Sequence, residues 1–226
     1  MPLSPFSTRF VEAPRRRNWW EPKFSISNAN LSDLDWDEHY KRGDVFWDKG
    51  TAAPALAEYL RRHPMRGRAL VPGCGRGRDV AMAAENGLDA IGLDIAPTAI
   101  AEARALYPEI AERFLIGNFF DPPAERRDAF DVLLEHTLLC ALPLAMRGDY
   151  RRAVDLTLRK GGLLVGVWFI NPALDPGEEG PPFGISVAEL TTLFEDGYEI
   201  VDDYVPNVAF PNREGRERVR VLRRLE

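Results

Sequence analysis

Short apolar segments alternate with helix-forming segments from residue 68 onward, and this alternation is the feature that most constrains the fold. Helical patterns occupy residues 79–86, 98–107, 149–158 and 186–194. Seven segments have the length and apolar content of strands, at residues 68–71, 89–93, 113–116, 130–134, 161–170, 198–204 and 218–225. This order predicts an α/β domain with a mostly parallel sheet and helices on both faces. Ligands bind such a sheet beyond the carboxyl ends of its strands.

The chain is predicted to form a single Rossmann-like domain with an N-terminal extension. Residues 1–32 contain four prolines and no hydrophobic period, so we expect an extended or partly disordered arm there. The domain is predicted over residues 33–226, beginning with a helix at 33–42 that Asp33 caps. Pro54 marks the start of a second helix that ends near residue 62. The last two of the seven strands are expected to pair as an antiparallel hairpin.

Composition and charge narrow the classes of partner. The net charge is −6, so the chain lacks the basic field that gathers phosphates, and we expect no nucleic-acid partner. No apolar run reaches the length of a membrane span and no secretion signal is visible, which indicates a cytoplasmic protein. Cys74, Cys140 and the three histidines show none of the spacings typical of a zinc site. We therefore expect no metal, and we expect the two cysteines to be reduced thiols.

A glycine-rich turn, Val-Pro-Gly-Cys-Gly-Arg-Gly-Arg-Asp, follows the first predicted strand. Gly73, Gly75 and Gly77 permit positive φ angles and a close approach of the backbone to a ligand. A dinucleotide fold has its third glycine where this chain has Arg78, which disfavours a nicotinamide-dependent dehydrogenase. The spacing favours a wider turn around a nucleoside without a pyrophosphate, and S-adenosylmethionine offers that chemistry. The alternative is a strand–helix turn that binds nothing.

Candidate cofactor-binding residues also follow each of the next two predicted strands. Asp94 lies 21 residues after Gly73, with Ile95 beside it, and its carboxylate can accept both hydroxyls of a ribose. Asn118 can bind the adenine amino group, and Phe119 can cover the adenine ring. The alternatives are a helix cap for the aspartate and an Asx turn with a core aromatic for the other pair. The glycine turn, Asp94 and Asn118 follow consecutive predicted strands, and this order supports a site for S-adenosylmethionine.

Several stretches of the chain resemble a known enzyme family. The glycine turn, Gly-Leu-Asp-Ile at 92–95 and Asn-Phe-Phe at 118–120 are similar to class I methyltransferases. Residues 36–50 and 130–142 resemble the thiopurine S-methyltransferase superfamily, most closely its thiol and halide methyltransferase branch. Gly-Pro-Pro-Phe at 180–183 and Pro-Asn-Arg-Glu-Gly-Arg-Glu at 211–217 extend this resemblance toward the C-terminus. It implies a class I methyltransferase domain that uses S-adenosylmethionine.

The resemblance implies that residues 33–50 form a lid over the cofactor, with contacts from Trp36, Tyr40 and Trp47. An indole face attracts a cation, and the sulfonium of the cofactor is one. Closing a lid would also exclude water. Tyr40 stands where the branch often has another tryptophan. The alternative is an amphipathic helix that buries its aromatic residues on the sheet edge.

The chain departs from the family just after the fourth predicted strand, where Glu135 and His136 replace a common Asp-Tyr pair. Both are expected to contact the cofactor. His136 could also accept a proton from a thiol or hydroxyl substrate, since imidazole titrates near neutral pH. Arg213 and Arg216 lie in a segment that resembles the substrate loop of the family. Arg213 could stabilise an anionic nucleophile there, and a solvated arginine is the alternative.

These features predict a monomeric enzyme that transfers methyl groups to a small molecule by in-line displacement. The acceptor is expected to be a small soft nucleophile, in the first place a thiol, with halide as a related acceptor. One alternative is O-methylation of a small phenol or acid, with His136 as the base. Another is a protein that binds S-adenosylmethionine without catalysis. In the methyl-transfer reactions the protein chiefly has to align the reactants and exclude water.

Overall fold

A computed structural model of the chain describes residues 35–170, 172 and 180–226. The predicted arm at 1–32 and the predicted cap Asp33 lie outside the described residues. Helix α1(Trp36–Arg42) begins later than expected, because the side chain of Asp35 caps it by accepting a hydrogen bond from the Glu38 amide at 3.0 Å.

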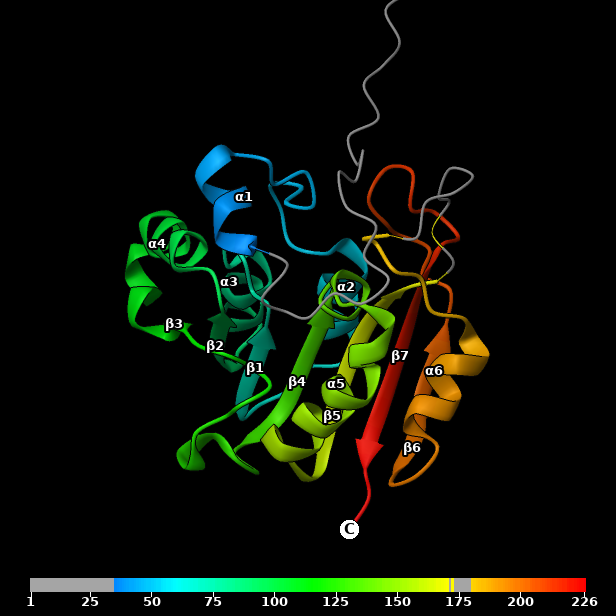
Figure 1. The fold of residues 1–226 in the computed structure, drawn as a ribbon. Coiled ribbons are helices and arrows are strands. Elements are labelled where there is room, and N and C mark those ends of the chain that lie inside the picture. Colours follow the sequence, from blue (N-terminus) through cyan, green and yellow to red (C-terminus); the bar gives the residue numbers. More distant parts are fainter. Residues whose placement is uncertain (1–34, 171, 173–179) are drawn as a thin grey trace, which may run out of the picture.

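Seven strands form one sheet in the order β3-β2-β1-β4-β5-β7-β6. The strands are β1(Arg68–Pro72), β2(Asp89–Asp94), β3(Phe114–Ile116), β4(Phe130–His136), β5(Leu158–Phe169), β6(Tyr198–Tyr204) and β7(Glu217–Arg224). The first five are parallel to one another, and β7 runs antiparallel to both β5 and β6 (Figure 1). The predicted α/β class, the mostly parallel sheet and the C-terminal hairpin are confirmed.

Helices cover both faces of this sheet, as predicted. The helices that follow α1 are α2(Pro54–Arg62), α3(Arg78–Glu85), α4(Pro97–Leu106), α5(Arg147–Thr157) and α6(Val187–Phe194). One hydrophobic cluster joins α2, α3 and α4 to one face of the sheet, and a second cluster joins α5 and α6 to the other. None of the helices in the described ranges is long and apolar enough to cross a membrane.

Strand β1 shows why the central strands read as continuous apolar runs. Ala69 and Val71 point into the first cluster, whereas Leu70 points into the second. A parallel strand buried on both faces needs apolar side chains at every position. Since β1 lies between β2 and β4, the strand order reverses there, and the carboxyl ends of these strands form a topological switch point.

The start of α3 shows what replaces the third glycine of a dinucleotide fold. Gly77 precedes the helix with φ 76°, and a Cβ atom there would collide with the ring of Phe114. A glycine at the helix start therefore lets α3 pack closely on the sheet, although Arg78 occupies the usual glycine position. Asp37 of α1 accepts a hydrogen bond from the Thr98 amide at 2.7 Å, which ties α1 to the start of α4.

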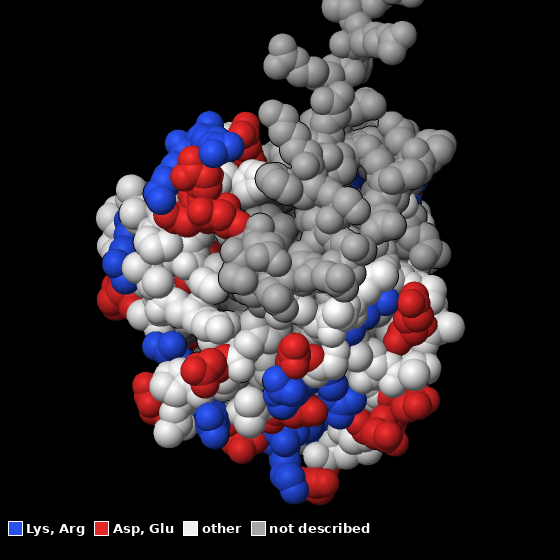
Figure 2. Space-filling view, in the orientation of Figure 1, with Lys and Arg blue, Asp and Glu red and all other residues white. Residues whose placement is uncertain are grey.

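Acidic and basic side chains lie side by side on the face drawn in Figure 2. On α1, Lys41 pairs with Asp37 at 2.7 Å and Arg42 pairs with Glu38 at 2.9 Å. Exposed pairs of this kind contribute little to stability. The acidic first turn and the basic last turn of α1 therefore pair with each other along the helix.

Candidate active site

A cavity of about 950 Å³ lies at the carboxyl ends of β1, β2 and β4. This is near the upper end of the range of ligand pockets, which is about 300–1,000 Å³. The structure brings together in its wall all the predicted site residues but one: Trp36, Tyr40, Trp47, Gly73, Gly75, Asp94, Ile95, Asn118, Phe119, His136 and Arg213. The exception is Glu135.

Asp94 anchors the glycine turn to the end of β2. One carboxylate oxygen accepts a hydrogen bond from the Gly75 amide at 2.8 Å, and the other accepts one from the Ala96 amide at 2.9 Å. The side chain is 9% exposed, and burial raises the pKa of its carboxyl. Each oxygen keeps a lone pair for a further donor. The residue therefore fits the predicted ribose contact and has a second role, in fixing the turn, that the sequence did not reveal.

Asn118, which follows β3, forms an Asx turn. The Asn118 side-chain oxygen accepts a hydrogen bond from the Phe120 amide at 2.9 Å. Phe119 is 5% exposed, and its ring centroid lies 6.1 Å from that of Tyr150 in the second hydrophobic cluster. The structure thus contains the Asx turn and core aromatic that were the alternative, while both side chains still border the cavity. Their contacts with adenine stay a prediction.

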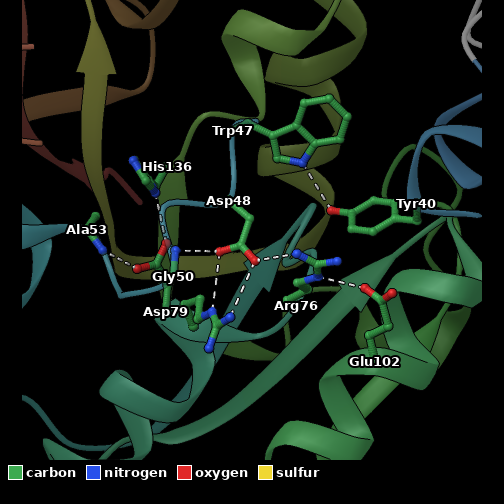
Figure 3. A network of polar contacts seen from close by, with 10 residues as sticks. Tyr40, Trp47, Asp48, Gly50, Ala53, Arg76, Asp79, Glu102 and His136 are labelled. Carbon is green, nitrogen blue, oxygen red and sulfur yellow. Dashed lines mark hydrogen bonds and ion pairs between the residues drawn. The ribbon is translucent and has the colours of Figure 1, made fainter. Parts of the chain in front are cut away.

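The aromatic residues of the N-terminal segment pack together above the glycine turn. The Trp47 ring centroid lies 5.5 Å from that of Trp36 and 5.9 Å from that of Tyr40. The Trp47 indole donates a hydrogen bond to the Tyr40 hydroxyl at 3.2 Å (Figure 3). A Cβ atom on Gly75 would lie 2.6 Å from this hydroxyl, so Tyr40 rests directly on the turn. The segment therefore packs on the glycine turn, and its role as a lid over the cofactor stays a prediction.

A buried aspartate holds this segment against the glycine turn. Asp48 pairs with Arg76 at 3.0 Å and with Arg78 at 3.3 Å. Arg76 also pairs with Glu102 of α4 at 2.6 Å (Figure 3). Burial opposes ionisation of Asp48, but hydrogen bonds from Gly50 and the two arginines outweigh it and lower its pKa. The two arginines of the glycine turn thus bind the N-terminal segment through Asp48. The sequence alone does not indicate this role.

Asp48→Ala is expected to weaken binding of S-adenosylhomocysteine about tenfold and to destabilise the protein by about 1–2 kcal/mol, because partly buried Arg78 loses its counter-charge and Arg76 keeps only Glu102. Calorimetric titration and thermal unfolding measure the two effects. Glu38→Ala is the matched control, since it removes an exposed carboxylate that pairs with Arg42 on the same segment. Equal behaviour of the two variants would show that Asp48 does not hold the lid.

Glu135 lies outside the cavity lining, and its predicted contact with the cofactor stays a prediction. Its carboxylate accepts hydrogen bonds from the Leu138 and Leu139 amides at 3.0 and 3.1 Å and from the Tyr150 hydroxyl at 2.8 Å. It is 2% exposed and faces the second hydrophobic cluster. Glu135 therefore fixes the turn that follows β4.

His136, the next residue, faces the cavity and is held by an aspartate. Its Nδ1 lies 3.0 Å from an Asp79 carboxylate oxygen, and the other oxygen of Asp79 accepts a hydrogen bond from the Ala53 amide at 2.8 Å (Figure 3). Asp79 was not among the predicted site residues. Only the folded chain brings it to His136, because 57 residues separate the two.

Arg213 is packed into the cavity wall rather than solvated. Its guanidinium lies 4.9 Å from the Phe169 ring centroid and 5.8 Å from that of Phe210, and its side chain is 13% exposed. It also lies 3.3 Å from Glu217. Lys49 lines the same cavity, and burial together with repulsion from Arg213 lowers its pKa. Two cations from distant parts of the chain therefore share this end of the cavity.

Cys74 and Cys140 also border the cavity, and both are free thiols. Burial raises the pKa of Cys140 to about 12 and also raises that of Cys74. A thiol is nucleophilic only as its thiolate. These side chains therefore line the site as small neutral groups.

The chain is similar to known methyltransferases in sequence and in fold. The family model described as thiopurine S-methyltransferase matches residues 31–224. A probable thiol methyltransferase of Arabidopsis thaliana is 30% identical over 191 residues, which are 81% of this chain and 82% of that protein. A 2-heptyl-1-hydroxyquinolin-4(1H)-one methyltransferase of Mycobacteroides abscessus is 28% identical over 174 residues, with 75% and 74% covered.

Solved structures share the fold. A 1,6-didemethyltoxoflavin-N1-methyltransferase of Burkholderia thailandensis with bound S-adenosylhomocysteine has a TM-score of 0.64 and 23% identity, with 84% of this chain and 85% of that chain covered. The family match spans most of the chain, and the cavity lies where the class I fold binds its ligand. The chain belongs to the thiopurine S-methyltransferase family and is an S-adenosylmethionine-dependent methyltransferase.

Proposed function

We propose that this enzyme methylates a small anionic sulfur nucleophile, a thiolate. The observation that carries the proposal is the pair of cations, Lys49 and Arg213, at one end of the cavity. An anion placed near both would relieve their mutual repulsion and would be stabilised by charge-assisted hydrogen bonds. The Arabidopsis relative, a probable thiol methyltransferase, supports a thiol as the acceptor.

The residues at the other end of the cavity fit the methyl donor. Asp94 would accept the ribose hydroxyls, Gly73 and Gly75 would let the backbone approach, and the Trp47 face would lie toward the sulfonium. When bound, S-adenosylmethionine supplies a methyl group on a sulfonium that leaves as a neutral thioether. The chain then has to align the thiolate and keep water out, which the lid and the Phe169 and Phe210 rings would do.

The direct test is a methyl-transfer screen with labelled donor over thiols, thiopurines, halides, thiocyanate and phenols. Thiols are expected to give the highest kcat/KM. A preference for halides or phenols over every thiol would overturn the proposed acceptor.

A hydroxyl acceptor is the second candidate, supported by the pairing of His136 with Asp79 and by the hydroxyquinolinone methyltransferase among the relatives. A cytoplasmic, monomeric enzyme is part of the same proposal.

Arg213→Gln is expected to raise KM for the thiol about 10- to 100-fold, because a hydrogen bond to a charged group is worth about 1.5–3 kcal/mol. Affinity for S-adenosylhomocysteine should change little, since the arginine is assigned to the acceptor. Steady-state kinetics and calorimetry separate the two. Arg223→Gln is the control, because Arg223 forms an exposed ion pair with Glu199 on the neighbouring strand. A KM unchanged from wild type in Arg213→Gln would remove the acceptor role.

A further inference from the structure

His136 has a buried ring nitrogen without a partner. The side chain is 10% exposed, and its Nε2 has no hydrogen-bond partner among the described residues. Buried polar groups in folded proteins are nearly always paired. Because His136 borders the cavity, the missing partner is expected to come from a bound molecule.

Asp79 determines which ring nitrogen of His136 can accept a hydrogen bond. It lies in the first turn of α3, where the Ala53 amide holds one carboxylate oxygen and His136 Nδ1 contacts the other. Figure 3 shows Asp79 between these two partners. A carboxylate can only accept a hydrogen bond, so Nδ1 carries the hydrogen and Nε2 is left as the acceptor.

Three carboxyl groups interact with the His136 ring. Asp79 of α3, Glu135 of β4 and Glu217 of β7 are the carboxyl groups that interact with His136, and Arg213 is paired with the last of these. Burial raises the pKa of both glutamic acids, and interaction with His136 opposes that rise.

We infer that Asp79 and His136 remove the proton from a thiol or hydroxyl borne on an aromatic ring, so that the enzyme accepts substrates that reach the cavity protonated. This inference rests on the proposed function and narrows its substrate class. The Phe210 ring centroid lies 6.0 Å from that of His136 at 30°, and Phe169 is on the same wall. A flat acceptor can stack on such faces. Halides and thiocyanate carry no proton and would not use the pair.

The proton and electrons balance without another reactant. The S–H or O–H bond of the acceptor breaks, its proton goes to Nε2, and its electron pair forms the bond to the methyl carbon. The bond between that carbon and the sulfonium sulfur breaks, and its pair stays on sulfur. The imidazolium then releases the proton to water. His136 is thus a catalytic residue, and Asp79 is a positioning residue.

Two series of acceptors, ring-substituted thiophenols and phenols, test the proton step. They range from compounds ionised at pH 7 to compounds protonated at that pH. His136→Gln and Asp79→Asn are expected to lower kcat/KM for protonated acceptors about 100-fold relative to ionised ones, since general bases contribute about that much. The loss should disappear as the pH rises above the pKa of each acceptor. His63→Gln, at the exposed end of α2, is the control.

Nitrogen-15 NMR of labelled histidine gives a readout that needs no turnover. The chain has three histidines, so the spectrum of His136→Gln assigns the signal. Wild-type His136 is expected to have Nε2 unprotonated, and Asp79→Asn should lose this preference. Protonation of Nε2 in the wild-type protein at neutral pH would overturn the inference. Equal losses of kcat/KM for ionised and protonated acceptors in the two variants would also overturn it. Failure of the wild type to methylate any thiol would instead overturn the proposed function.

Discussion

Asp94→Asn is expected to weaken binding of S-adenosylhomocysteine roughly 100- to 1,000-fold, because two hydrogen bonds from ribose hydroxyls to a carboxylate are together worth about 3–4 kcal/mol. The carboxylate is buried at the end of β2, at the switch point of the sheet. Asparagine keeps one acceptor oxygen for the backbone amides of Gly75 and Ala96, but it loses the charge. Calorimetric titration of the purified enzyme measures the change.

The pH dependence of the same titration has a defined sign. Burial raises the pKa of Asp94, and the protonated carboxyl is the weaker acceptor. Affinity should therefore be full above that pKa and should fall as the pH drops through it, beginning at a higher pH than for an ordinary aspartate at about 3.9. Asp94→Asn should lack this fall.

Asp89→Asn is the matched control, since Asp89 is at the exposed start of the same strand and pairs with Arg113 at 2.7 Å. It is expected to bind S-adenosylhomocysteine like the wild type. Thermal unfolding of both variants checks the fold, because Asp94 also holds the glycine turn. Similar affinity of Asp94→Asn and Asp89→Asn in folded proteins would remove the ribose assignment.

The fold was predictable because its signals are local. The central strands are apolar at successive positions, and a capping box at Ser186 and Glu189 marks α6 as the sequence suggests. Helix α2 and strand β6 have the predicted bounds. Strand β4 continues two residues beyond the predicted Leu134, because His136 still pairs with Val167 of β5 although neither of the added residues is apolar.

The lining of the cavity was predictable from spacing along the chain at the strand ends, and from the family resemblance at Trp36, Tyr40, Trp47 and Arg213. The glycine turn, Asp94 and Asn118 follow consecutive strands, and parallel strands bring their carboxyl ends together. The pairs Asp48–Arg76 and Asp79–His136 join separate elements, 28 and 57 residues apart, and no local pattern indicates them.

Strand geometry separates Glu135 from His136. Successive residues of a strand point to opposite faces of the sheet. Glu135 and His136 are successive residues of β4, so their side chains lie on opposite faces. The histidine borders the cavity, and the glutamate faces the second hydrophobic cluster.

Asp203→Asn is expected to lower the free energy of unfolding by about 2–4 kcal/mol. Asp203 pairs with Arg218 and, at 2.8 Å, with Arg220, whose side chain is 2% exposed. Arg220 also donates a hydrogen bond to Thr191 of α6 at 2.9 Å. Removing the carboxylate leaves a buried cation without a counter-charge, which is strongly destabilising. Urea denaturation measures the loss.

The effect should depend on pH in a defined direction. Burial opposes ionisation of Asp203, but the two arginines outweigh it and lower the pKa to about 2. A lowered pKa contributes stability that is present above the ordinary value of about 3.9 and is lost as the pH falls toward 2. The difference between wild type and Asp203→Asn should therefore be constant at neutral pH and should shrink below pH 4.

Glu199→Gln is the control, because it removes an ion pair from the same hairpin at a site where both side chains are 47% exposed. Such a pair is worth about 0–1 kcal/mol. Equal destabilisation by the two variants would show that the buried arginine does not depend on Asp203.

Strands β6 and β7 flank the segment 205–216, which carries Arg213. If the Asp203 pairs fix that segment, Asp203→Asn should also raise KM for the acceptor without changing affinity for S-adenosylhomocysteine.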